Sequence, residues 1–306
     1  AGPSRRGSQR WAIELLRVLH GAAMALRAGR LAAVLIAAAA AIFSASAAAE
    51  TYSFGVLSQR SAVLTAQYWN PILEYVKQKT GIELQLKIAR TAPESNDAAE
   101  RGEYDFVYSN TIFQPRMAKA NYQVILRPLE EAVAAQIVTL SDSTIRNLRD
   151  LGGREVGFPS QAAFLGYAVP MDELLRQGIS VTPVFGGNQE GIMAQLKAGR
   201  VIAAAVNSQV MKVYAAREGL RYRVLWQSSP YNNLPIAASP RVPAAITNAV
   251  KAAIDGMDQD ADGLKVLQAS GQVIGQKPPY GFKAASPDDY RNYVDFYRQT
   301  LVRDYK

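Results

Sequence analysis

Ser160 is the first residue of this chain whose type and position suggest chemistry. It lies between an apolar stretch and a helix-like stretch in GREVGFPSQAAFLGYAVP, residues 153–170. The letters EVGF predict a short strand, and a strand that leads directly into a helix leaves the helix's first backbone N–H groups unpaired. Such groups can bind an anion. Because serine is also a common N-cap residue, the alternative is an ordinary capped helix.

The residue types that are missing restrict the chemistry further. The chain contains no cysteine, and its single histidine is His20. Residues 50–306 therefore offer no thiol nucleophile, no imidazole base, no Cys/His metal site and no disulfide. A hydrolase or lyase would need Asp, Glu, Lys or Tyr as its general base, and only Tyr108 lies at a predicted strand end. We expect a protein that is not an enzyme and that needs no cofactor and no metal.

Residues 1–49 differ in composition from the rest of the chain. They contain six arginines and one acid, and then the apolar run Leu31–Phe43, which is followed by SASAAAE. The run is too short to span a bilayer, and small residues after it are typical of a cleavage site. We therefore predict a secretory signal peptide over residues 1–49 and a product that is free in the periplasm. The intact mass of the exported protein tests this prediction.

The basic character of the chain comes largely from that segment. The formal net charge is +8, and without the six arginines and one acid of residues 1–49 it is +3. No run of basic residues follows, so the sequence predicts no nucleic-acid partner. Residues 50–306 are longer than most single domains, which favours two lobes.

Strand-like and helix-like stretches alternate along residues 50–306. The strand-like stretches are 52–57, 82–89, 104–108, 122–126, 134–140, 155–158, 181–185, 201–206 and 221–226. The helix-like stretches include 62–80, 95–101, 111–119 and a C-terminal helix that begins at Ser286 and whose apolar face comprises Tyr290, Tyr293, Val294, Tyr297 and Leu301. This alternation predicts an α/β fold in which ligands bind outside the carboxyl ends of strands.

Two segments share one pattern, in which a helix end and a glycine precede a short strand and a polar tip. They are AAERGEYDFVYSN, residues 98–110, and AQLKAGRVIAAAVNS, residues 194–208. The pattern is common in α/β proteins. If the segments belong to separate lobes, their asparagine tips could face each other.

In order and spacing, these stretches resemble the periplasmic solute-binding proteins of phosphate/phosphite/phosphonate-type ABC importers, the phosphonate-binding group. The similarity covers about Tyr52 to Leu267 and is carried by FGVLSQRS, YWNPILEYVKQKTG, GEYDFVYSN, IVTLSDSTIRNLRDLGGREVGFPS, VPMDELLRQGI and GGNQEGIMAQLKAGRVIAAAVNS. The resemblance implies a type II periplasmic binding fold, with two α/β lobes joined by a two-strand hinge and a ligand cleft between them. It places lobe one at residues 50–134 plus 235–306 and lobe two at residues 135–234.

The same resemblance implies which residues bind the ligand. They are Gln59, Arg60, Ser61, Tyr108, Ser109, Asn110, Ser160, Asn188, Gln189, Asn207 and Ser208. Arg60 and Ser160 favour an anionic solute. The family's acids that hold an amino group have no counterpart, because the aligned residues are Asn207, Ser208 and Gln209. A buried amine without a carboxylate would be held poorly, so an aminoalkylphosphonate is not expected.

The implied function is that of the substrate-binding component of an ABC importer, a monomer that delivers a small anion to an inner-membrane permease. The same fold could instead signal, by presenting its closed form to a membrane-bound sensor kinase. Neighbouring genes would distinguish the two functions, because permease and ATPase genes support import and kinase genes support sensing. The sequence leaves the identity of the ligand open.

Overall fold

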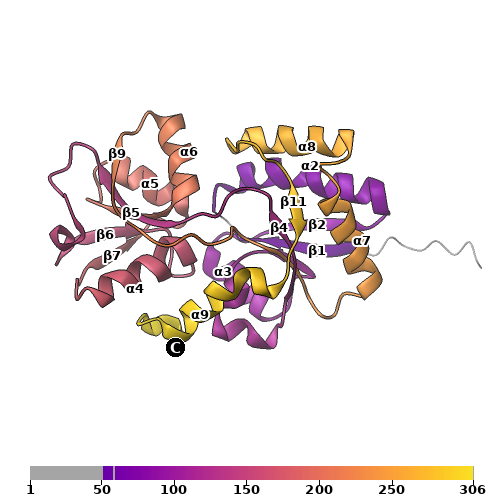
Figure 1. The fold of residues 1–306 in the computed structure, drawn as a ribbon, viewed down its shortest axis with the longest axis horizontal. Coiled ribbons are helices and arrows are strands. Elements are labelled where there is room, and N and C mark those ends of the chain that lie inside the picture. Colours follow the sequence, from indigo (N-terminus) through magenta and orange to yellow (C-terminus); the bar gives the residue numbers. More distant parts are fainter. Residues whose placement is uncertain (1–50, 58, 306) are drawn as a thin grey trace, which may run out of the picture. The chain divides into compact units, whose positions relative to one another are not determined.

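The structure is a computed structural model that describes residues 51–57 and 59–305. The predicted signal peptide, residues 1–49, lies outside the described residues. The described chain forms two β-sheets, each packed between helices (Figure 1). None of its helices is both long and apolar enough to cross a membrane.

The first sheet has six strands in the order β11-β4-β10-β3-β1-β2. β1 pairs in parallel with β2 and β3, whereas β10 is antiparallel to β3 and β4, and β11 is antiparallel to β4. Its strands are β1 (Thr51–Val56), β2 (Glu83–Ile88), β3 (Phe106–Tyr108), β4 (Gln123–Pro128), β10 (Ile236–Ala238) and β11 (Phe282–Ala284). Its helices are α2 (Ala62–Thr80), α3 (Ala92–Glu100), α7 (Ala244–Asp255) and α8 (Ala261–Val273).

Neighbouring residues of these strands fill two different cores. Phe106 packs with Trp69 and other residues of the core beneath α2, α7 and α8. Val107 packs instead with residues of α3. Because successive side chains of a strand point to opposite faces, a strand covered on both sides has a continuous apolar sequence. The letters FVY of β3 follow this rule.

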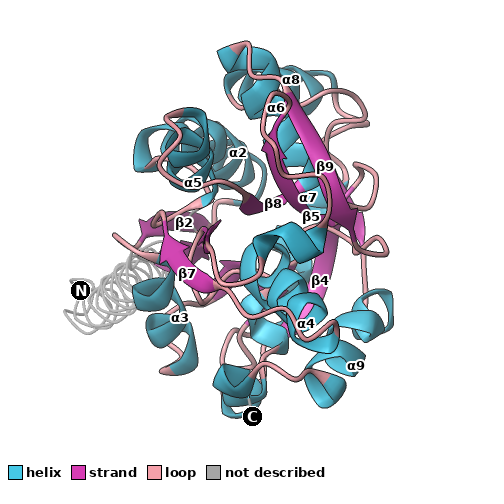
Figure 2. Cartoon of the chain, turned by 90° about the vertical axis from the view of Figure 1, so that its left-hand side faces the viewer, coloured by secondary structure: helices cyan, strands magenta, loops and turns pink. Residues whose placement is uncertain are grey.

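The second sheet has five strands in the order β7-β6-β8-β5-β9. β6 is parallel to β7 and β8, and β5 is antiparallel to β8 and β9. Figures 1 and 2 show α4 on one face of this sheet and α5 and α6 on the other. The elements are β5 (Ala135–Leu140), β6 (Glu155–Phe158), β7 (Thr182–Phe185), β8 (Ala204–Asn207), β9 (Tyr222–Gln227), α4 (Val169–Arg176), α5 (Gln189–Lys197) and α6 (Ser208–Glu218).

The chain passes between the two sheets twice, outward through residues 129–134 and back through residues 228–235. The two crossings are paired with each other. The backbone N–H of Val133 donates to the Tyr231 carbonyl at 2.8 Å, and the N–H of Tyr231 donates to the Val133 carbonyl at 2.8 Å. A two-stranded connection of this kind can act as a hinge, and that role stays a prediction.

The predicted elements differ from the observed ones in a few places. Each predicted strand corresponds to one of β1–β9, but the sequence predicts no strand at β10 or β11. These two strands have only three residues each, too few for a recognisable alternation. The predicted helix over 111–119 is wrong, because Pro115 favours an extended backbone at Gln114 and divides the segment into 3₁₀ turns at 111–113 and 115–119.

The C-terminal segment begins with the predicted cap and ends earlier than predicted. Ser286 forms a capping box with Asp289, and the 3₁₀ turn Pro287–Tyr290 leads into α9 (Arg291–Gln299). Tyr290, Tyr293 and Tyr297 are buried and Val294 is half-buried, but Leu301 is 42% exposed. The expectation that Leu301 belongs to the apolar stripe is wrong, because α9 ends at Gln299 and the backbone is extended at Thr300.

Residues beyond α9 contact α4 of the second sheet. The Thr300 hydroxyl donates to Asp172 at 2.9 Å, and the Leu301 N–H donates to the same oxygen at 2.6 Å. The Tyr305 hydroxyl also donates to the carbonyl of Gln161. The C-terminal segment thus follows β11 of the first sheet in sequence and supports residues 161–172 of the second.

Candidate ligand-binding site

A cavity lies where strands of both sheets end. Its polar lining consists of Gln59 after β1, Asn110 after β3, Ser160 after β6, Asn188 and Gln189 after β7, and Asn207 at the end of β8. The other lining residues are apolar or glycine, so no lining residue carries a charge. We refer to it as the neutral cavity. The tips of the two similar segments, Asn110 and Asn207, both line it, one from each sheet.

Asn207 caps helix α6 at this cavity. Its Oδ1 accepts hydrogen bonds from the backbone N–H groups of Gln209 at 2.9 Å and Val210 at 3.3 Å. Its own backbone N–H donates to Oε1 of Gln189 at 3.0 Å. The side-chain Nδ2 is buried and has no hydrogen-bond partner among the described residues. Capping therefore leaves one buried donor unsatisfied at the cavity wall.

Helix α5 begins at the same cavity. Gly187 adopts a φ of 85°, which places the chain in the left-handed region that glycine tolerates best. Asn188 then caps the helix, because its Oδ1 accepts from the Gly191 N–H at 2.8 Å. The N-termini of α5 and α6 thus both lie at this cavity, and the positive ends of their dipoles favour an anion.

Ser160 does not cap a helix. Of the two explanations that the sequence left open, an anion site and an ordinary capped helix, the capped helix is therefore wrong. Its Oγ accepts from the Ala162 N–H at 3.2 Å and forms a local turn. A π-helical turn, Phe164–Ala168, follows and leads into α4. Since the oxygen of Ser160 serves as an acceptor in this turn, its hydroxyl hydrogen can be donated to a ligand.

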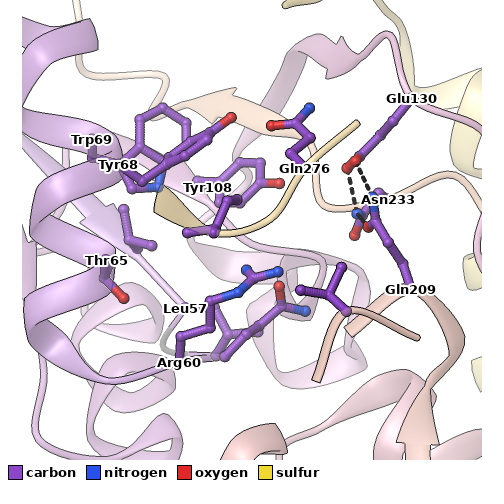
Figure 3. Close-up of a pocket in the computed structure, with 14 residues that line it drawn as sticks. Leu57, Arg60, Thr65, Tyr68, Trp69, Tyr108, Glu130, Gln209, Asn233 and Gln276 are labelled. Atoms are coloured by element: carbon purple, nitrogen blue, oxygen red, sulfur yellow. Dashed lines mark hydrogen bonds between the residues drawn. The ribbon is translucent and has the colours of Figure 1, made fainter. Parts of the chain in front are cut away.

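A second cavity shares Leu57 and Gln59 with the neutral cavity but has a different character. Figure 3 shows Arg60 near Tyr108. Glu130 lies away from Arg60, beyond the side chains of Tyr68 and Tyr108, and is hydrogen-bonded to Asn233. We refer to it as the charged cavity. Its other polar or aromatic lining residues are Thr65, Tyr68, Trp69, Gln209 and Gln276.

Glu130 is held by amide groups from two other segments. Its Oε1 accepts from Nδ2 of Asn233 at 2.6 Å, and its Oε2 accepts from Nε2 of Gln209. Nδ2 of Asn233 also lies 3.1 Å from Oε1 of Gln209. This cluster joins the outward crossing, the return crossing and the start of α6. Because no described cation pairs with it, the carboxylate is stabilised by neutral donors alone.

The two charges of this cavity act on the same pair of phenols. Burial raises the pKa of Tyr68 and Tyr108, the negative charge of Glu130 raises it further, and Arg60 partly opposes the shift. Both residues are therefore neutral hydroxyls near neutral pH.

The predicted site residues divide into three groups. Those that line the neutral cavity are Gln59, Asn110, Ser160, Asn188, Gln189 and Asn207, and those that line the charged cavity are Gln59, Arg60 and Tyr108. The other three line neither cavity. Ser61 caps α2, Ser109 bonds to the Thr111 hydroxyl at 2.7 Å, and the Ser208 hydroxyl accepts from the Ala134 N–H at 3.0 Å.

Sequence reasoning missed the acid of the charged cavity. The expected site residues lie at strand ends, whereas Glu130 belongs to the outward crossing, where the letters LEEA were the available signal. The structure describes no group of three or more His, Cys, Asp or Glu side chains that could hold a metal ion.

Solved structures share the fold of the described chain. A binding protein component of an ABC phosphonate transporter from Pseudomonas aeruginosa has a TM-score of 0.69 and 15% identity, with 80% of this chain and 85% of that chain covered. PhnD1 from Prochlorococcus marinus, in complex with methylphosphonate, has a TM-score of 0.68 and 15% identity, with 81% and 97% covered. The alkanesulfonate-binding protein SsuA from Xanthomonas axonopodis pv. citri, bound to MOPS, has a TM-score of 0.56 and 17% identity, with 81% and 91% covered. The fold is that of periplasmic binding proteins.

The sequence also identifies the family. Residues 54–290 match the family described as "ABC transporter, phosphonate, periplasmic substrate-binding protein". Because the match spans most of the chain, the chain belongs to this family of periplasmic proteins. No curated protein matches the sequence. The family and the α/β fold predicted from the sequence are thereby confirmed.

Proposed function

We propose that the solute is a small oxyanion, a phosphonate or a similar organic anion, and that the protein binds it in the neutral cavity without changing it chemically. The observation that carries this proposal is the cavity lining, in which amide and hydroxyl donors and two helix N-termini meet without an acid. Support comes from PhnD1, whose structure holds methylphosphonate, and from SsuA, named for alkanesulfonates. Donors aimed at one point are what an anion needs when it loses its water.

Delivery to an inner-membrane permease requires that the protein distinguish its loaded from its empty form. In this proposal lobe one is residues 50–134 plus 235–306, lobe two is residues 135–234, and the crossings between them are the hinge. An anion held by Asn110 on one side and by Ser160 and Asn207 on the other would favour the closed form. The protein would act as a monomer, after removal of residues 1–49.

A thermal-shift screen of oxyanions, neutral sugars and amines with the protein from residue 50 onward tests the proposal. A solute at about 100 times its dissociation constant stabilises the folded state by about 2.7 kcal/mol. We expect oxyanions to raise the melting temperature and the other solutes to leave it unchanged. The best anion should also lower the radius of gyration measured by solution scattering. Stabilisation by a sugar or an amine but by no anion would show that the proposal is wrong.

A further inference from the structure

The neutral cavity contains one unsatisfied acceptor in addition to its donors. Asn110 is 3% exposed, and its Oδ1 has no hydrogen-bond partner among the described residues. Asn207 is 1% exposed, and its Nδ2 has no partner in the same part of the chain. A buried polar atom without a partner costs about 1–3 kcal/mol, which is why such atoms are rare. Both residues line the same cavity, so a ligand that satisfies both atoms recovers that cost.

Tyr293 determines which end of the Asn110 amide is free. The Tyr293 hydroxyl donates its only hydrogen to the carbonyl of Asn232 at 2.6 Å. Asn110 can therefore bond to the Tyr293 oxygen only as a donor, through its Nδ2. Burial raises the pKa of Tyr293, and the hydrogen bond from Asn110 opposes that shift, as a donated N–H should. The oxygen of Asn110 is the end left for the cavity.

Four other polar residues of the lining, Asn188, Gln189, Asn207 and Ser160, have their oxygens engaged by the backbone. The side-chain oxygens of Asn188, Gln189 and Asn207 already accept backbone N–H groups, so their NH₂ ends remain. The oxygen of Ser160 accepts from Ala162, so its hydrogen remains. Several donors therefore line the cavity, and the Asn110 oxygen is the one buried side-chain acceptor of its described lining that has no partner. A fully ionised oxyanion could use the donors but would place a lone pair against Asn110 Oδ1.

We propose that the neutral cavity binds an oxyanion in its singly protonated form, with Asn110 Oδ1 accepting the acid hydrogen and Ser160 and Asn207 donating to the ionised oxygens. This inference rests on the proposed function and names the class of ligand, a phosphorus oxyacid with one ionisable hydrogen left. Phosphate monoesters lose their second proton at about pH 6, so such acids are partly protonated near neutrality. Sulfonates have no second proton. The cavity should therefore select a phosphonate against a sulfonate of the same size.

The protein itself has little that could titrate near neutral pH around this cavity. No lining residue is ionisable, and the described residues include no histidine and no cysteine. The ionisable groups of the surrounding elements include Arg60, Arg90, Glu94, Tyr108, Glu130, Tyr167, Glu190, Lys212, Arg217, Glu218, Tyr231, Tyr293, Tyr297, Asp304 and Tyr305. Burial raises the pKa of Tyr108, Tyr231 and Tyr293 further above neutrality. A pH dependence near neutrality would thus report the proton of the ligand.

Calorimetry with methylphosphonate and methanesulfonate, two probes of matched size, tests the inference. A site built around a donated hydrogen rejects an analogue without it strongly, so we expect methylphosphonate to bind at least about a hundredfold more tightly. Its affinity should fall about tenfold per pH unit above its second ionisation, because the complex retains the proton. Equal affinities, or tighter binding of the sulfonate, would overturn this inference and leave the oxyanion proposal standing. Binding of neither probe would overturn this inference, and the oxyanion proposal fails as well if no anion of the thermal-shift screen stabilises the protein.

Variants then locate the acceptor. Asn110→Leu removes the acceptor oxygen. It should lower the affinity for methylphosphonate by about tenfold or more without lowering the affinity for methanesulfonate. Ser160→Ala is the matched control, because it removes a donor that both probes use, and the ratio of their affinities should persist. Tyr293→Phe keeps the ring that stacks on Phe164 but frees the Asn110 amide to turn, so the ratio should fall. If the ratio of the affinities for methylphosphonate and methanesulfonate is unchanged in both Asn110→Leu and Tyr293→Phe, Asn110 Oδ1 is not the acceptor. If the leucine variant does not fold, an unchanged ratio in Tyr293→Phe alone leads to the same conclusion.

Discussion

The neutral and the charged cavity share the lining residues Leu57 and Gln59 but differ in charge and in aromatic content. The polar lining of the neutral cavity consists of amides and one hydroxyl, and capping bonds to the backbone fix two of the amides, Asn188 and Asn207. The charged cavity has Arg60 and Glu130 beside the rings of Tyr68, Trp69 and Tyr108. Fixed dipoles provide direction and therefore selectivity, whereas charges act over a longer range with less regard to geometry.

The difference between the cavities suits two parts of one ligand, an anionic group in the neutral cavity and an organic substituent in the charged cavity. An anion held by neutral donors avoids a buried ion pair, whose desolvation can exceed its Coulombic gain. The charged cavity has the aromatic faces that an organic substituent needs. Arg60 would then attract the anion from a short distance, without being its main partner. The predictions below test this division by changing charge in one cavity at a time.

The largest effect should come from a negative charge in the neutral cavity. Ser160→Asp places a carboxylate among the donors, and two like charges about 4 Å apart repel by about 4 kcal/mol at the effective dielectric of a protein surface. We expect the affinity for methylphosphonate, measured by calorimetry, to fall at least about a hundredfold. Unchanged affinity would mean that the anion does not occupy the neutral cavity.

Ser61→Asp is the matched control for that change. Ser61 caps α2 and lines neither cavity, and aspartate is an equally good N-cap residue. The same substitution at this position should therefore preserve the fold and change the affinity by no more than a few-fold. A loss at Ser61 as large as that at Ser160 would show that net charge, not position, governs binding.

Local patterns were sufficient to predict most of the fold. α2 ends at Thr80 as predicted, because Gly81 adopts a φ of 74° and no other residue type closes a helix there as readily. The strands β1–β9 have enough apolar residues to be recognised. β10 and β11 do not, because each has three residues and is defined only by its pairing with distant strands.

The site could be predicted only in outline, for a similar reason. Strand ends are visible in the sequence, and the resemblance to the family implied that Asn110, Ser160 and Asn207 at these ends bind the ligand. Which end of each amide faces the cavity depends on partners such as Tyr293, which is far away in sequence. The separation of Arg60 from Ser160 into different cavities, and the presence of Glu130 beside Arg60, also depend on tertiary structure.

A smaller effect should follow from removing the positive charge of the charged cavity. Arg60→Gln should lower the affinity for methylphosphonate by about tenfold at low salt, and the loss should shrink as salt is added, because a charge acting through solvent is screened. Arg90→Gln, which alters an exposed arginine that lines neither cavity, should change little. A hundredfold loss that persists in high salt would place the anion in direct contact with Arg60 and reverse the division between the cavities.

The smallest effect should come from Glu130, and it should be a gain. Glu130→Gln keeps the length of the side chain and an oxygen that can accept from Asn233, but it removes the one negative charge among the residues that line the two cavities. We expect calorimetry to show methylphosphonate binding about threefold more tightly, an effect of screened Coulombic size. Glu131→Gln makes the same change at an exposed neighbour that lines neither cavity, and it should have no effect.

An aminoalkylphosphonate tests Glu130 more directly than methylphosphonate does. Its amino group would need a carboxylate, and Glu130 is the one acid that lines either cavity. The sequence predicts that such a solute is not bound well, and the amide cluster around Glu130 agrees, because Asn233 and Gln209 already occupy both carboxylate oxygens. If the parent protein prefers the aminoalkylphosphonate and Glu130→Gln loses that preference by about tenfold or more, the charged cavity is an ammonium site, and the prediction against an amine is wrong.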